Sequence, residues 1–80
     1  PRGAQRDAVV AEAAFRRAAL SHRDSAVAYN NLAHVLAELG RLVDAEAAAR
    51  HAVSLGGPLQ AQAQKTLEAI LERRAAAPAR

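Results

Sequence analysis

Four polar residues that could bind a ligand follow one another closely near the middle of the chain. Asn30, Asn31, His34 and Glu38 have the spacing i, i+1, i+4 and i+8, which places them along one stripe of a helix. A side-chain amide donates and accepts hydrogen bonds at once, as a peptide bond does. The stripe is therefore a candidate surface for hydrogen bonding to a ligand.

The same part of the chain does not point to a metal or a catalytic centre. His34 and Glu38 are four residues apart and could reach one ion, but structural zinc takes four ligands and catalytic zinc three plus water. The chain has no cysteine. Ser21, Ser25 and Ser54 fall at expected helix ends, where serine caps a helix. We therefore expect no enzyme activity, no metal and no cofactor.

An octet of the sequence returns 34 residues later, and this repeat organises the whole chain. Residues 11–18 read AEAAFRRA and residues 45–52 read AEAAARHA, with six of the eight positions identical. A period of this length is typical of helical solenoids, which stack helix pairs and bind partners on their concave face.

Hydrophobic periodicity and turn residues predict an all-α chain with four helices. Ser25 or Asp24 should cap the second helix, and Gly40 and Gly56 should end the second and third helices in the left-handed conformation. Connectors this short require neighbouring helices to pack antiparallel. The helices are expected over about residues 5–21, 26–39, 42–55 and 58 or 59 to 76.

The composition argues against nucleic acid and membrane as partners. The chain has 80 residues and a net charge of +3, and much of its apolar content is alanine. Phe15 and Tyr29 are its two aromatic residues and the arginines are scattered, whereas nucleic-acid sites concentrate charge and use stacking aromatics. No apolar run approaches the roughly 20 residues of a membrane helix, and no signal peptide is visible. We expect neither nucleic acid nor membrane as a partner; the compartment stays open, cytoplasmic by default.

In the central segment, the spacing Tyr29-x2-Leu32-Ala33-x2-Leu36 is followed by Gly40, Ala45, Ala49, Ala52 and Pro58. This pattern resembles the tetratricopeptide repeat. Leu36 and Ala49 replace aromatics of the family pattern, and the extra glycine puts Pro58 one residue late. Leu67 and Leu71 take the places of Leu32 and Leu36 in the last helix.

This resemblance implies a right-handed superhelix of antiparallel helix pairs over residues 1–80. Residues 1–21 would be the second helix of a truncated repeat, 26–59 one complete repeat, and 58–77 a terminal or capping helix. The first helix of each pair lines the concave groove in this family. Asn31 matches a position that holds a ligand's backbone, while Asn30 and His34 match positions used against a carboxylate. Lys65 is the cation available to complete such a clamp.

The leading interpretation is a non-catalytic scaffold that binds a peptide or partner helix through Asn30, Asn31, His34, Glu38 and Lys65. A structural alternative is the terminal cap of a longer solenoid or an appendage of a catalytic parent. Alanine-rich repeats ending in Gly-Gly-Pro also resemble the tails of some bacterial cysteine peptidases of the bacteriocin-processing type. A third interpretation is a basic helical fragment whose binding to nucleic acid or an anionic surface would collapse with salt.

One further expectation concerns the first helix, which lacks a pairing helix of its own. Its apolar stripe should remain uncovered, and an uncovered apolar stripe could drive the chain to form a homo-oligomer or to pair with another chain. The stripe consists of Val10, Ala11, Ala14, Phe15 and Ala18.

Overall fold

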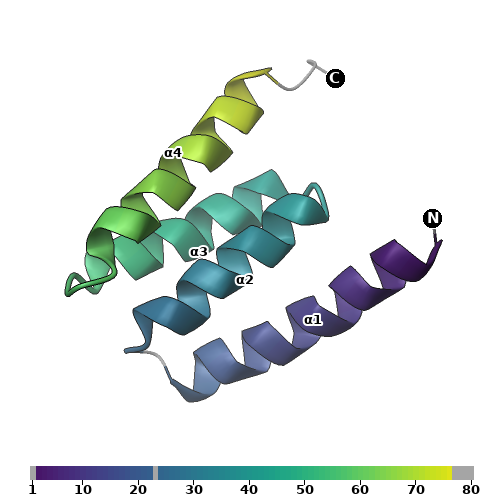
Figure 1. Cartoon of the computed structure of the whole chain (residues 1–80), viewed down its shortest axis with the longest axis horizontal. Coiled ribbons are helices and arrows are strands. Elements are labelled where there is room, and N and C mark those ends of the chain that lie inside the picture. Colours follow the sequence, from purple (N-terminus) through teal and green to yellow (C-terminus); the bar gives the residue numbers. More distant parts are fainter. Residues whose placement is uncertain (1, 23, 77–80) are drawn as a thin grey trace.

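Four α-helices and no strand make up the part of the chain that the structure describes. The structure is a computed structural model that describes residues 2–22 and 24–76, with side chains from residue 10 onward except at residue 11. The helices are α1 (Arg2–Ser21), α2 (Ala26–Glu38), α3 (Leu42–Ser54) and α4 (Gln60–Ala76). Each runs antiparallel to the one before it, and together they form a flat fan (Figure 1). The predicted all-α class and four helices are confirmed.

The turn residues act as the sequence predicts at the end of α2. Gly40 has a φ of +79°, a conformation that costs other residues about 1–2 kcal/mol. Its N–H donates to the carbonyl of Ala37 at 3.0 Å, and the N–H of Arg41 donates to that of Leu36 at 2.9 Å. This pair of bonds is the Schellman motif, which satisfies carbonyls that the helix end leaves open. At the other end of α2, Ser25 Oγ accepts from the Ala28 N–H at 3.2 Å.

Two helix boundaries differ from the prediction. Helix α1 begins at Arg2 and not near residue 5. Helix α4 begins at Gln60 and not at Pro58 or Leu59, because the chain first turns: the Gln60 N–H donates to the Gly57 carbonyl at 3.1 Å. Gly56 and Gly57 both have positive φ, +68° and +75°. The turn at Gly56 and Gly57 therefore lengthens the connector before α4.

The core is built mainly from alanine and leucine. Ala33 in α2 and Ala45 in α3 have no exposed surface, which lets the helices approach closely. Among the described residues, helix α2 packs against all three other helices, whereas α1 packs against no helix other than α2. The buried apolar residues are Ala19, Leu32, Ala33, Leu36, Ala37, Ala45, Ala48, Ala49, Ala52, Ala63, Leu67 and Ile70.

Candidate functional site

A small groove lies between α2 and α4 and has a volume of about 140 Å³. Ala37 and Ile70 are buried and form its apolar floor. Polar and charged side chains from both helices surround that floor. The lining consists of His34, Ala37, Glu38, Thr66, Ala69, Ile70 and Arg73.

A hydrogen bond joins the two helices across the groove. Thr66 Oγ1 donates its single proton to the Gln62 carbonyl at 3.1 Å. It lies 3.3 Å from His34 Nε2, so it accepts from that nitrogen. The imidazole of His34 therefore carries a proton on Nε2 and, when neutral, keeps Nδ1 as an acceptor. This contact fixes the ring at the edge of the groove.

Two opposite charges remain available in the groove. Glu38 and Arg73 are both exposed, and neither forms an ion pair or side-chain hydrogen bond with another described residue. A carboxylate accepts from N–H groups, and a guanidinium donates to carbonyls or to a carboxylate. A ligand with both donors and acceptors, such as a peptide, matches this pair.

The structure brings together only part of the predicted stripe. His34 and Glu38 line the groove, but Asn31 is half-buried outside the lining and Lys65 is exposed on α4 away from it. The sequence predicted Lys65 as the cation of the site, whereas the groove contains Arg73. The missed residue Thr66 is seven positions before Arg73, the spacing of residues on one helix face.

Asn30 departs most clearly from the expectation of a ligand contact. Its side chain is 4 % exposed, and its Oδ1 has no hydrogen-bond partner among the described residues. The predicted stripe spans about 100° of the helix, with Asn30 at one edge and Asn31 at the other. Asn30 is at the edge that also carries the buried Ala33 and Ala37. The groove therefore cannot present Asn30 to a peptide while α2 keeps its packing.

We expect the Asn30→Ala variant to be more stable than the native chain by about 1 kcal/mol. A buried polar atom without a partner costs about 1–3 kcal/mol, and alanine favours a helix more than asparagine does. The smaller side-chain volume offsets part of this gain. Urea unfolding followed by circular dichroism measures the change, with the half-buried Asn31→Ala as the matched control. Destabilisation of Asn30→Ala by 1 kcal/mol or more, on the order of one hydrogen bond, would contradict this expectation.

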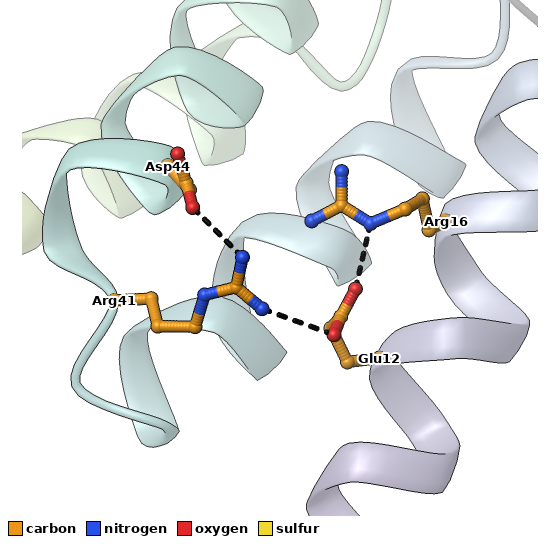
Figure 2. A network of polar contacts seen from close by, with 4 residues as sticks. All are labelled: Glu12, Arg16, Arg41 and Asp44. Atoms are coloured by element: carbon orange, nitrogen blue, oxygen red, sulfur yellow. Dashed lines mark hydrogen bonds and ion pairs between the residues drawn. The ribbon is translucent and has the colours of Figure 1, made fainter.

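An ion cluster joins α1 to the start of α3. Glu12 Oε2 accepts from Arg16 Nε at 2.7 Å, and Glu12 Oε1 accepts from Arg41 Nη1 at 3.2 Å. Arg41 also donates to Asp44 Oδ2 at 3.0 Å. Figure 2 shows Arg41 between the two carboxylates. Each of these four charged side chains thus has at least one partner of opposite charge.

The second copy of the octet forms the same kind of cluster. Glu46 Oε2 accepts from Arg50 Nε at 2.8 Å, and Glu46 Oε1 accepts from Arg74 of α4. Glu12 and Glu46 occupy the same position of the repeat. Each pairs with the arginine four residues later and with a second arginine from another part of the fold. The glutamate of each octet copy thus binds one arginine of its own helix and one arginine from outside that helix.

Glu46 should make folding sensitive to acid. Hydrogen bonds from Arg50 and then from Arg74 lower the pKa of Glu46 below its ordinary value of 4.5. A carboxyl whose pKa is lowered on folding stabilises the fold above its unfolded pKa, and this contribution is lost as the pH falls through the folded value. When the pH is lowered from neutral to below 4.5, the free energy of unfolding should therefore fall less for Glu46→Gln than for the native chain.

Urea unfolding at a series of pH values checks this result. Glu72→Gln is the control, because Glu72 is exposed and makes no ion pair with a described residue. It should keep the native pH dependence. A Glu46→Gln curve that follows the native one would show that this cluster does not govern the acid response.

A wider hollow of about 470 Å³ lies between α1 and α3, over α2. The rings of Tyr29 and His51 meet within it, with centroids 3.9 Å apart. Its charged side chains include the Glu12 cluster, whose members already pair with one another. The α2–α4 groove is therefore the better candidate site, because its charged residues Glu38 and Arg73 form no ion pair, whereas the Glu12 cluster in this larger hollow is paired.

Comparisons with protein-family models, with curated proteins and with solved structures found no match. No helix in the described ranges is long and apolar enough to cross a membrane. Over residues 2–22 and 24–76, no group of three or more His, Asp or Glu side chains could hold a metal ion. The geometry of the chain itself is thus the basis for assigning its role.

Proposed function

We propose that this chain is a non-catalytic helical-repeat scaffold of the tetratricopeptide type that binds an extended peptide between α2 and α4. The observation that carries the proposal is the groove's unpaired Glu38 and Arg73 beside an apolar floor. Such a site binds a peptide through its backbone and one or two side chains. The 34-residue repeat and the antiparallel helix order support the repeat assignment.

The charge distribution favours a protein partner over nucleic acid. Arg16, Arg41, Arg50 and Arg74 are all engaged by carboxylates. Nucleic-acid binding requires arginine and lysine side chains that are free to neutralise phosphates. These four arginines instead contribute to links within and between helices.

Selection from a random peptide library displayed on phage tests the proposal. We expect enriched peptides whose affinity falls at least tenfold, about 1.4 kcal/mol, on Arg73→Ala and on Glu38→Ala. Lys65→Ala removes an exposed cation from the same helix outside the groove, and should bind normally. Absence of selected peptides, or peptides insensitive to Arg73 and Glu38, would refute the groove as a peptide site.

A structural role as a solenoid cap is the second candidate. Helix α4 carries Glu68 and Glu72, both exposed, at the positions that Ala33 and Ala37 occupy in α2 when Leu67 is aligned with Leu32. Terminal repeats typically have such polar outer faces. A cap without a binding role would yield no selected peptide, so the same experiment separates the two functions.

A further inference from the structure

The α2–α4 groove has the size of a single side chain of a ligand. Its volume of about 140 Å³ is well below the roughly 300–1,000 Å³ of sites that enclose a whole small molecule. It is close to the volume of an engineered apolar cavity in another protein, about 150 Å³, which holds one benzene molecule. The groove therefore accommodates one residue of a bound peptide, and the rest of the peptide lies outside it.

The floor of the groove favours an apolar side chain. Ala37 and Ile70 are buried beneath it, and Ala69 lines it as well. An apolar group placed on these side chains removes their remaining surface from water. A charged side chain of either sign would instead share this small volume with a like charge, either that of Arg73 or that of Glu38.

The guanidinium of Arg73 decides between an aliphatic and an aromatic side chain. It forms no ion pair with another described residue. An aliphatic side chain lying against it would exclude water from an unpaired charge, which is costly. The face of an aromatic ring is electrostatically negative and attracts a cation within about 6 Å of its centre. An aromatic side chain thus fills the groove and also gives Arg73 a partner.

Another part of the chain already holds an aromatic ring with the same kinds of group. In the hollow between α1 and α3, the Tyr29 ring lies against the His51 ring, and Arg41 lines the same hollow. The groove likewise combines an imidazole with a guanidinium. Its imidazole is that of His34, which the contact of Nε2 with Thr66 Oγ1 holds in place. An aromatic ring of a ligand can pack against both groups.

We propose that the α2–α4 groove recognises a peptide through one aromatic residue, which lies on Ala37 and Ile70 and against Arg73. This inference rests on the proposed peptide-binding function and adds the class of residue that the groove recognises. Glu38 accepts a backbone N–H of the same peptide beside the ring. The groove therefore prefers phenylalanine or tyrosine to leucine at this position, and disfavours lysine, arginine and glutamate.

Two phage-displayed peptide libraries test this specificity on the whole chain. The central residue is phenylalanine in one library and leucine in the other, and the remaining positions are random without aromatic residues. We expect binders from the phenylalanine library alone. In the tightest binder, cyclohexylalanine in place of phenylalanine keeps the size and the apolar character but removes the aromatic face. This replacement should weaken binding about threefold or more.

A variant of the chain that fills the groove provides an independent readout. Ala69→Leu places a larger side chain in the lining and should weaken binding of the same peptide at least tenfold. Ala61→Leu is the matched control, because it makes the same change at an exposed position of α4 outside the groove, and it should bind normally. Ala69 is exposed, so circular dichroism should show both variants folded.

The outcomes separate this inference from the proposed function. Binders from the leucine library that lose affinity on Arg73→Ala would leave the peptide site intact but overturn its aromatic specificity. Equal binding of the cyclohexylalanine peptide would do the same, and so would unchanged binding to Ala69→Leu, which would place the ring outside the groove. Absence of binders from the phenylalanine library would overturn the inference. Absence of binders from the fully random library as well would overturn the proposed function.

Discussion

Replacement of Leu36 by alanine is expected to lower the free energy of unfolding by about 3 kcal/mol. Among the described residues, Leu36 is the largest side chain that is fully buried, at 1 % exposure. Leucine-to-alanine changes in cores cost about 2–5 kcal/mol, because transfer energy is lost and a cavity remains. The alanines that make up much of this core cannot extend into the cavity. The fold therefore has little means of relaxing around it.

The loss is large for a chain of 80 residues, whose whole stability is about 4–12 kcal/mol at typical values per residue. Urea unfolding monitored by circular dichroism measures it. Val43→Ala is the control, since Val43 is 65 % exposed on α3, and its effect should stay within about 0.5 kcal/mol. A Leu36→Ala effect as small as that of the control would mean that the core is not centred on α2.

The second large effect is expected from Ala33→Leu, which should destabilise the fold by about 3 kcal/mol. Ala33 has no exposed surface and belongs to the same core cluster as Ala45 and Ala49. Added methylene groups in a packed core force side chains and backbone to shift, typically at a cost of about 1–3 kcal/mol. Helix α2 packs on every other helix, so displacing it disturbs all of these contacts.

Ala61→Leu makes the same chemical change at an exposed position of α4 and should leave stability within about 0.5 kcal/mol of the native value. Thermal and urea unfolding compare the two variants. Ala33→Leu could instead be as stable as Ala61→Leu, or more stable than the native chain. There would then be space between the helices for the larger side chain, although Ala33 is buried. Close approach through alanine would then not be a requirement of this fold.

Stability and recognition depend on different faces of α2. Leu36 and Ala33 belong to the core, whereas His34 and Glu38 line the groove on the adjoining side. Variants of the first pair should change stability, and variants of the second pair should change binding while the chain stays folded. Asn30 was expected to bind a ligand, but it belongs with the core residues Leu36 and Ala33, since its side chain is buried.

The amino-acid sequence alone predicted what depends on neighbours along the chain. The four helices, the Ser25 cap and the left-handed Gly40 follow from periodicity and local conformational preference. The predicted uncovered stripe of α1 is confirmed in part: Val10 and Ala14 are exposed, whereas Phe15 packs against the core, Ala18 is half-buried and the side chain of Ala11 lies outside the described residues. The ion pairs of Glu12 with Arg16 and of Glu46 with Arg50 were not predicted, although they join residues one helical turn apart and so depend on local spacing.

Only the tertiary structure decided which side chains meet between helices. His34 pairs with Thr66, and Glu46 pairs with Arg74. Both contacts depend on which residues of α4 lie opposite α2 and α3, and the turn at Gly56 and Gly57 sets this alignment. The same packing buries Asn30 and places Arg73, not Lys65, in the groove. A helical periodicity specifies a face to within about a third of a turn, whereas the burial of one residue depends on how closely the next helix approaches.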